Sequence, residues 1–410
     1  MSRVVITGIG MATPLGLGVP ATWAAVCAAK NAVGPVKRFD ASGFPVTFAA
    51  EVDDPGIPAD PGRWASAAGA LVDLKARLAF ATAREALEMS GLETGGPRVG
   101  VCLGSEASRP PLDRVAERMV QNKLPSATEL LPLAPQAPTQ LVAQMVGAGG
   151  PLSTISTACT SSSQAIGEGI LRIRRGEVDA MVVGGVDVLV DPIMITGFAL
   201  LGALSTRNDA PQAASRPFDI SRDGFVLGEG AGMLVIESEA HARARGAEIL
   251  GVLSGFGCSC NAYRITDSPP DGRGAYQSMR AALRDANLQP GDIGYVNAHG
   301  TSTPMNDASE TRGIRRAFGD ATDRVPVSST KSMMGHLVAA CGAVEAILCL
   351  LAVRDGVLPP TLNLDQPDPA CDLRHVPLVA ERAAVRHAMT NAFGFGGSNG
   401  TLILSSTDIL

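Results

Sequence analysis

The chain has 410 residues, of which 46% are hydrophobic and 18% are charged. This length is enough to bury a large core and exceeds the size of one small domain. The formal net charge of -6 at pH 7 excludes the broad positive surface that a general nucleic-acid-binding protein needs.

The first predicted element is a strand over residues 3–10, "RVVITGIG", which ends in a glycine turn. This start lacks the charged, apolar and cleavage regions of a secretory signal peptide. No run of about 18 apolar residues follows, so we expect no membrane span and a cytoplasmic protein. The eight cysteines form no CxxC pair and no cysteine–histidine pattern of a metal site, so we expect no metal.

Strands and helices alternate along the rest of the chain, which predicts the α/β class. Apolar residues recur at helical spacing over residues 74–91, which predicts an amphipathic helix that ends at Gly91. Residues 98–105 and 179–188 are largely apolar and β-branched, which is typical of strands covered on both faces. Residues 106–150 are rich in Pro and Gln, and we expect loops with short helices there that cover a pocket or build an interface.

A faint internal repeat indicates that the chain has two similar halves. The stretch "AREALEMSGL" (83–92) resembles "MRAALRDANL" (279–288), and a predicted strand follows each. We therefore divide the chain into residues 1–250, with the inserted segment 106–150, and residues 251–410. No Pro- or Ser-rich linker separates the halves, so we expect them to share one body.

The strongest candidate for a nucleophile is Cys159, in the stretch "STISTACTSSSQAIG". If the following residues form a helix, the thiol lies at its N-terminus, where free N–H groups and the helix dipole stabilise a thiolate. The small neighbours allow a sharp backbone turn and leave room for an acyl group. A buried, inert cysteine is the alternative that local spacing leaves open.

Two of the five histidines lie in glycine turns at strand ends, where open α/β sheets place their chemistry. His299 follows an apolar strand in "YVNAHGTSTP", and His336 lies in "SSTKSMMGHL" on a turn that enters a helix. Lys331 and Glu345 belong to the same turn and helix and are candidates for an ion pair. The alternatives are structural histidines and solvated charges.

A glycine-rich loop, "NAFGFGGSNG" (391–400), follows another predicted strand. It lacks the lysine and the glycine spacing of a phosphate-binding loop, so a phosphate cradle is the weaker interpretation. The other interpretation is a backbone N–H directed at a developing oxyanion. In that case Phe393 and Phe395 would pack beside the bound chain.

Taken together, the motifs resemble the elongating β-ketoacyl-[acyl carrier protein] synthases of the thiolase-like superfamily. They are, in chain order, "VVITGIGMATPLG", "TACTSSSQAIG", "STRNDAPQAASRPFDISRDGFVLGEGAGMLVIE", "YVNAHGTSTP", "SSTKSMMGHL", "PPTLNLDQPD" and "NAFGFGGSNG". The resemblance covers nearly the whole chain. It implies a thiolase-like, five-layered αβαβα fold made of two similar halves, and a homodimer or a heterodimer with a chain-length-factor-like subunit.

By position, the resemblance makes Cys159 the acyl-accepting nucleophile and places His299 and His336 beside it. The backbone N–H groups of Cys159 and Phe395 would form the oxyanion hole. The resemblance also makes Lys331 and Glu345 a supporting polar pair and places Phe393 and Ala107 at the acyl pocket. It places Thr301 and Thr303 at the pantetheine arm. Arg207 would face the carrier protein.

The implied reaction is a decarboxylative Claisen condensation. An acyl chain moves from an acyl carrier protein to Cys159, malonyl-[acyl carrier protein] loses CO2, and the carbanion attacks the thioester to give 3-oxoacyl-[acyl carrier protein]. His299 and His336 would stabilise the enolate with protonated Nε2 atoms on neutral rings. No metal or redox cofactor is implied, because the phosphopantetheine arrives on the carrier protein.

Several positions depart from the family pattern near the acyl pocket. Glu106 and Ala107 stand where many relatives have a Gly-rich segment with a bulky aliphatic gate. Met334, Asn306 and Cys341 also replace the usual residues of their motifs. These departures leave fatty acid synthesis and a specialised polyketide or aryl polyene pathway as alternatives.

A non-catalytic partner subunit of the chain-length-factor kind is the alternative from a different functional class. Such subunits lack the cysteine nucleophile, whereas this chain has Cys159, His299 and His336. A biosynthetic thiolase would carry a second catalytic cysteine near its C-terminus, and a starter-unit synthase would have Asn in place of His336. The sequence therefore favours the elongating enzyme.

Overall fold

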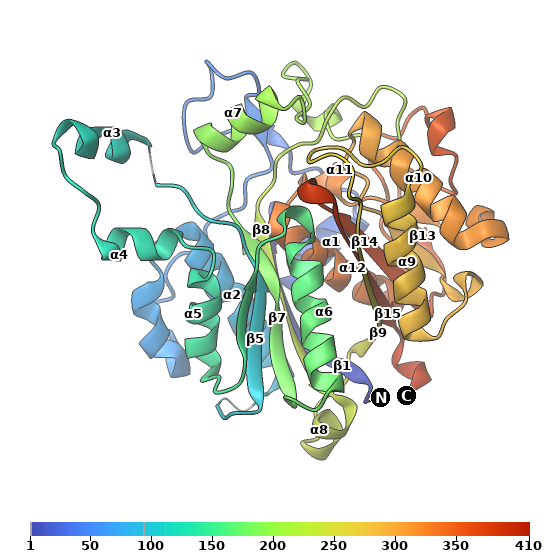
Figure 1. The fold of residues 1–410 in the computed structure, drawn as a ribbon, viewed down its shortest axis with the longest axis horizontal. Helices are drawn as coiled ribbons and strands as arrows, with labels where there is room; N and C mark the ends of the chain where they lie inside the picture. Colours follow the sequence, from blue (N-terminus) through green and yellow to red (C-terminus); the bar gives the residue numbers. More distant parts are fainter. Residues whose placement is uncertain (1, 93–94, 111) are drawn as a thin grey trace.

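The computed structural model of the chain describes residues 2–92, 95–110 and 112–410. Two sets of five strands carry the fold (Figure 1). The first set has the order β6-β5-β7-β8-β1 and the second the order β11-β10-β14-β15-β9. The strands are β1 (Val4–Thr13), β5 (Val99–Gly104), β6 (Leu152–Ile155), β7 (Ala180–Asp187), β8 (Gly230–Ser238), β9 (Gly251–Cys260), β10 (Tyr295–Asn297), β11 (Val327–Ser328), β14 (His387–Phe393) and β15 (Ser398–Ser405).

The two sets repeat one another strand for strand. In the first set, β5 pairs in parallel with β6 and β7, and β8 pairs antiparallel with β7 and β1. In the second, β10 pairs in parallel with β11 and β14, and β15 pairs antiparallel with β14 and β9. β1 and β9 pair antiparallel and join the sets. Because β9 begins at Gly251, this topology supports the proposed division into residues 1–250 and 251–410.

Helices cover the outer faces of the two sets and fill the space between them (Figure 1). α2 packs on the first set with α5 beside it, and α9 packs on the second set with α10 beside it. α6 and α12 lie between the sets, in contact with each other and with strands of both. The predicted five-layered αβαβα fold of two similar halves is confirmed. The six helices are α2 (Leu74–Ser90), α5 (Ala137–Val146), α6 (Ser161–Arg174), α9 (Arg273–Ala286), α10 (Pro304–Phe318) and α12 (Cys341–Asp355).

Local sequence explains why these helices take inner and outer places. All residues of α12 from Cys341 to Ala352 are buried, as expected of a largely apolar helix enclosed on all sides. α2 has the predicted amphipathic pattern and the predicted end. The side chain of Asp73 caps its first turn by accepting the Ala76 N–H, and Gly91 ends it with a φ of 58°.

The inserted segment forms loops with short helices, as predicted. α3 (Leu112–Val120) stands away from the main body in Figure 1, and residue 111 lies outside the described residues. α5 packs on α2 and β5 and belongs to the outer layer. The inserted loops therefore end near residue 136, before the expected boundary at residue 150. The other short elements are α1 (Val19–Cys27), β2 (Gly16–Leu17), β3 (Gly34–Pro35), β4 (Phe48–Ala49), α4 (Ala127–Leu130), α7 (Pro192–Leu200), α8 (Glu239–Ala244), α11 (Lys331–Met334), β12 (Val357–Leu358) and β13 (Glu381–Arg382).

Glycines let the outer helices rest directly on the backbone of the sheet. Gly8 and Gly10 of β1 face α2, and a Cβ at either position would lie 2.0 Å from a helix carbonyl oxygen. Gly255 and Gly257 of β9 face α9, with 2.4 Å and 2.2 Å to the carbonyl oxygens of Ala282 and Ser278. The high glycine content therefore serves close backbone approach at matching strands of the two halves.

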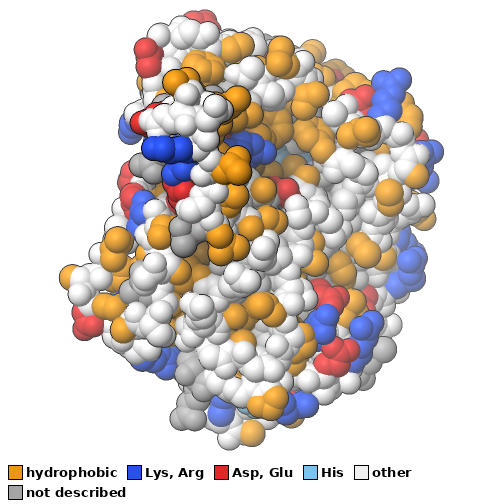
Figure 2. Space-filling view, turned by 60° about the vertical axis from the view of Figure 1, so that its left-hand side comes forward, with side chains coloured by type: hydrophobic (Ala, Val, Ile, Leu, Met, Phe, Trp, Pro, Cys, Tyr) orange, Lys and Arg blue, Asp and Glu red, His pale blue; other side chains and the backbone are white. Residues whose placement is uncertain are grey.

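Charged side chains of both signs are mixed over the surface. On the face drawn in Figure 2, Lys and Arg side chains are spread out and several lie beside Asp or Glu. Arg98 with Asp179 and Arg172 with Glu168 are examples of such surface pairs. This face therefore lacks the single-sign field typical of a nucleic-acid-binding surface. Within the described ranges, no helix has the length and apolar character needed to cross a bilayer.

We expect Gly10→Ala and Gly257→Ala each to lower the free energy of unfolding by about 1–3 kcal/mol, because the new methyl group would overlap a helix carbonyl oxygen. Gly291→Ala is the matched control, since nothing lies within 4 Å of a Cβ at that position. The control should change the free energy of unfolding by less than about 0.5 kcal/mol. Chemical denaturation measures the difference, and equal stability of all three variants would contradict backbone-limited packing.

Candidate active site

Cys159 lies in a tight turn, Ala158–Thr160, between β6 and α6. Ala158 adopts a positive φ of 52°, a conformation that costs a residue with a Cβ on the order of 1–3 kcal/mol. The packing under the turn is close, because a Cβ at Gly104 would lie 2.4 Å from the backbone N of Ser162. Small side chains are therefore required around this cysteine, whose side chain is almost fully buried at the start of α6.

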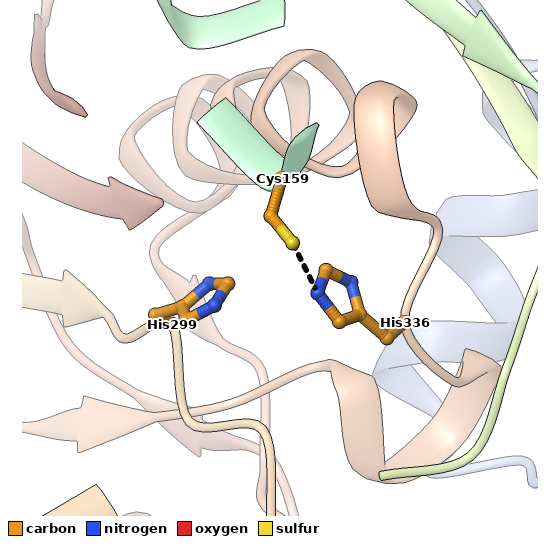
Figure 3. Close-up of side chains that lie close together, drawn as sticks. All are labelled: Cys159, His299 and His336. Carbon is orange, nitrogen blue, oxygen red and sulfur yellow. Dashed lines mark hydrogen bonds between the residues drawn. The ribbon is translucent and has the colours of Figure 1, made fainter. Parts of the chain in front are cut away.

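Two histidines from the C-terminal half face the thiol (Figure 3). His336 follows α11, and its Nε2 lies 3.0 Å from Cys159 Sγ. His299 follows β10, and its ring centroid lies 5.3 Å from that of His336 in a T-shaped arrangement. The structure thus brings together the three side chains that the sequence predicts as the reacting group.

His336 is held as a neutral hydrogen-bond donor. Its Nδ1 accepts the backbone N–H of Val338 at 3.3 Å, so the proton of the neutral ring is on Nε2 and faces the sulfur. Burial lowers the pKa of His299 and of His336 well below the usual value, and the positive charge of Lys331 lowers both further. Both rings are therefore uncharged at neutral pH.

The thiol of Cys159 is harder to ionise than its place at a helix start predicts. Burial raises its pKa to about 12, although the charge of Lys331 and the backbone N–H groups of Phe395 and Cys159 lower it. The sequence pattern predicts a thiolate, and the structure differs because desolvation outweighs the favourable donors. The thiol proton therefore has to leave when the sulfur is acylated.

Lys331 and Glu345 form the ion pair that the sequence leaves as a candidate, and both side chains are almost fully buried. Burial lowers the pKa of Lys331, but Glu345, Cys341 and Glu310 together raise it above the usual value, so the ammonium group stays charged. Neither residue lines the cavity over the thiol. The charge of Lys331 lowers the pKa of Cys159, His299 and His336 without direct contact with the cavity.

An open cavity lies over Cys159, His299 and His336. Thr301 and Thr303 line it, with their hydroxyl oxygens 2.9 Å apart. Its apolar wall is formed by Phe198, Leu201, Phe225, Met305, Phe393 and Phe395. The cavity therefore combines an apolar wall with two hydroxyl groups, which suits a largely apolar chain that carries polar groups.

The glycine-rich loop reaches the sulfur through its backbone. The N–H of Phe395 donates a hydrogen bond to Cys159 Sγ. A Cβ at Gly394 would lie 3.3 Å from the backbone N of Cys159, so only a residue without one allows this approach with ease. The ring of Phe393 packs on His299 with centroids 5.6 Å apart. This geometry fits the oxyanion interpretation of the loop.

Two residues that the sequence places at the site lie away from the cavity wall. Ala107 is exposed and does not line the cavity, so its place at the acyl pocket stays a prediction. Arg207 is half-buried, lies 3.7 Å from the carboxylate of Asp223 and donates to the carbonyl of Ser221 at 2.6 Å. It follows the cavity-lining residues 201–203 along the chain, and its carrier-facing role stays a prediction.

Sequence reasoning missed two carboxylates that hold the turns of the site. The buried Glu310 of α10 accepts the backbone N–H groups of His299 at 2.9 Å and of Gly300 at 2.8 Å, and burial raises its pKa to about 7. Glu106 accepts the backbone N–H of Ala158 at 3.0 Å. No local pattern distinguishes these residues from solvated charges, because the partners of Glu310 lie 10 and 11 positions away and that of Glu106 lies 52 positions away.

Cys159, His299 and His336 are also the only group in the described part of the chain that is spaced to hold a metal ion. The sulfur and one nitrogen of each ring lie within 4.8 Å of one another, and Zn²⁺ accepts thiolate and imidazole ligands. Metal binding would require the Nε2 of His336 to lose the proton that the Val338 contact keeps there. The arrangement is better suited to donating hydrogen bonds to an oxygen atom.

Both halves of the chain match β-ketoacyl synthase families. Residues 1–242 match Beta-ketoacyl synthase, N-terminal domain, and residues 250–365 match Beta-ketoacyl synthase, C-terminal domain. The chain is 44% identical over 414 residues to 3-oxoacyl-[acyl-carrier-protein] synthase 2 of Coxiella burnetii, with 98% of each chain covered. It is 43% identical over 411 residues to the protein of the same name from Vibrio cholerae, again with 98% of each chain covered.

Solved structures of ketosynthases have the same fold. A β-ketoacyl synthase from Burkholderia phymatum is similar with a TM-score of 0.90 and 34% identity, over 99% of this chain and 100% of that one. The AntDE:AntF complex, a type II polyketide ketosynthase with its acyl-carrier protein, is similar with a TM-score of 0.89 and 30% identity, over 99% and 100%. The ishigamide ketosynthase/chain length factor is similar with a TM-score of 0.87 and 32% identity, over 99% of each chain. The chain therefore belongs to the β-ketoacyl synthase family, as its motifs predict.

Proposed function

We propose that this chain is an elongating 3-oxoacyl-[acyl carrier protein] synthase, which joins an acyl chain to a malonyl unit with loss of CO2. The observation that carries this proposal is the position of Cys159 Sγ, 3.0 Å from the protonated Nε2 of His336 and beside His299, under an open cavity. A non-catalytic subunit of the chain-length-factor kind has no need of this arrangement, so the enzyme is favoured over that alternative.

In the first step, Cys159 Sγ attacks the carbonyl carbon of an acyl thioester in the cavity. The bond between that carbon and the carrier sulfur breaks, and the proton of the Cys159 thiol leaves with the carrier thiol. The backbone N–H groups of Cys159 and Phe395 are the donors that would stabilise the developing oxyanion. In comparable sites, each such donor contributes about 2.7–4 kcal/mol to transition-state stabilisation.

In the second step, a malonyl thioester loses CO2 and leaves an enolate on its thioester oxygen. His299 and His336 donate hydrogen bonds to that oxygen as neutral rings, so the developing charge is stabilised without proton transfer. The carbanion then attacks the carbonyl carbon of the Cys159 thioester and the carbon–sulfur bond breaks. The released thiolate takes a proton from solvent, and the product is the 3-oxoacyl thioester of the carrier.

The substrates are proposed to arrive on acyl carrier proteins, whose phosphopantetheine arm enters the cavity. The hydroxyl groups of Thr301 and Thr303 support this proposal, because they provide polar contacts for such an arm. A relative solved in complex with its acyl-carrier protein supports it as well. Arg207 is proposed to face the acidic carrier, and the two steps require no separately bound cofactor.

The acyl chain is proposed to be of the fatty acid type. Relatives named 3-oxoacyl-[acyl-carrier-protein] synthase 2 are 39–44% identical to this chain, whereas the polyketide and ishigamide ketosynthases are 30% and 32% identical. The chain is also proposed to work as a dimer, either with a second copy or with a chain-length-factor-like subunit. The terminal position of β6 in the sheet and the exposed Leu152 on it support such pairing.

Incubation with an acyl carrier protein that carries a saturated acyl chain should add the mass of the acyl group to Cys159. Cys159→Ala should show neither the adduct nor a 3-oxoacyl product, because Cys159 is the one cysteine among the described residues that line the cavity. His336→Ala should still be acylated but should form at least about 100-fold less 3-oxoacyl product. Intact-mass spectrometry and chromatography of the products measure the two steps.

The same experiment with polyenoyl carriers tests the pathway. Faster use of polyenoyl than of saturated chains would reject the fatty acid assignment and favour a specialised pathway. An unmodified Cys159 with every carrier would reject the enzyme itself.

Decarboxylation of malonyl carrier protein by Cys159→Ala should not weaken as the pH falls from about 8 to about 6. Burial lowers the pKa of His299 and His336 well below 6.5, so both rings stay neutral over this range and become charged only at lower pH. Initial rates of CO2 release across the range measure the profile. An acid limb with its midpoint near 6.5 would contradict buried neutral donors.

Lys331→Met should lower the free energy of unfolding by about 3–5 kcal/mol, because it leaves the buried Glu345 without its counter-charge. The double variant Lys331→Met/Glu345→Leu should regain most of that stability, since it removes both charges. It should remain a poor catalyst, because the Lys331 charge that lowers the pKa of the Cys159 thiol is gone. Denaturation and condensation assays separate the two effects, and a double variant with full activity would contradict the electrostatic role.

A further inference from the structure

Three charged residues near Cys159 have no part in the proposed reaction. Lys75 and Asp187 form a buried ion pair, with Nζ 3.1 Å from Oδ1, and both are almost fully buried. Lys75 Nζ also donates to the backbone carbonyl of Glu106 at 2.5 Å. Glu106 follows β5 and is half-buried between this pair and the turn that carries the cysteine.

The carboxylate of Glu106 accepts hydrogen bonds from that turn. Its Oε1 accepts the backbone N–H of Ala158 at 3.0 Å and lies 3.3 Å from the hydroxyl of Ser161. Its Oε2 accepts the hydroxyl of Ser156 at 2.8 Å. Because Ala158 is the residue with the positive φ, the carboxylate holds the strained residue of the turn directly.

A second set of contacts runs from Glu106 toward His336. Lys75 bridges the carbonyl of Glu106 and the carboxylate of Asp187. Asp187 Oδ2 in turn accepts the backbone N–H of Ala339 at 3.3 Å. Ala339 lies three residues after His336, in the turn that precedes α12. Buried polar contacts therefore connect the turn of the sulfur with the turn of the imidazole.

We propose that Glu106 is a positioning residue that holds Cys159 Sγ within hydrogen-bonding distance of His336 Nε2. Lys75 and Asp187 connect Glu106 to the turn that follows His336. The inference rests on the proposed function only in taking Cys159 as the reacting group. The charge of Glu106 has an opposite, unfavourable effect, because it raises the pKa of the Cys159 thiol. A carboxylate at this position is therefore explained by its hydrogen bonds and not by its charge.

The variants Glu106→Gln and Glu106→Ala separate the two effects. Both remove the negative charge, but only Gln keeps an acceptor for the Ala158 N–H. The readout is the rate of alkylation of Cys159 by iodoacetamide from about pH 6 to about pH 10, which needs no carrier protein. Peptide mass analysis distinguishes Cys159 from the exposed Cys258 and Cys260.

We expect Glu106→Gln to be alkylated faster than the unchanged protein at neutral pH, with its pH profile shifted to lower pH. Glu106→Ala should have the same shift but react about 10-fold more slowly than Glu106→Gln across the range, because the turn is no longer held. The rate of acyl transfer to Cys159 should likewise be lower in Glu106→Ala than in Glu106→Gln. Equal alkylation rates of the two variants would overturn the inference.

Glu106→Asp keeps the charge but draws the carboxylate back by one methylene group, so it serves if the alanine variant does not fold. It should be alkylated more slowly than the unchanged protein with no shift of the profile to lower pH, and an unchanged rate would overturn the inference. If the alkylation rates differ as expected but no variant accepts an acyl group from any carrier, the proposed function fails and the positioning role stands.

Discussion

Burial of polar and charged groups around the reacting side chains is the constraint on which the site depends. Lys331, Glu345 and Glu310 are removed from water, which is tolerable only because each has an ionic or hydrogen-bonding partner in place. The same burial keeps the rings of His299 and His336 neutral. A wetter site would let both rings titrate near neutral pH and would weaken each hydrogen bond to a developing charge.

The duplicated topology explains why the reacting groups meet. α6 and α12 occupy matching places in the two halves and contact each other in the middle layer, so the turns that precede them come together. One turn carries Cys159 and the other follows His336. β5 and β10 also match, and Glu106 and His299 follow their ends. One supersecondary unit, used twice, therefore places four different functional groups at one point.

Motifs predicted the fold class, the layers and the grouping of Cys159, His299 and His336, because these residues lie at strand ends and helix starts that small residues mark in the sequence. The structure places Ala107 at the surface, which no motif reports because the path of a loop depends on tertiary packing and not on periodicity. The protonation state of the thiol depends on desolvation by surrounding elements, which no local pattern reports. Glu106 was seen only as a departure, since its partner Ala158 is 52 positions away.

The glycines at layer contacts have one more consequence. A Cβ at Gly342 of α12 would lie 2.9 Å from the backbone N of Ser163 in α6, so the middle helices also meet at main-chain distance. The distance between the cysteine sulfur and the imidazole ring is then set by main-chain contacts. Substitutions of core side chains can change this distance only slightly. Substitutions that change the range of substrates are therefore expected at residues of the cavity wall, such as Phe198 and Leu201, which lie outside the repeated layers.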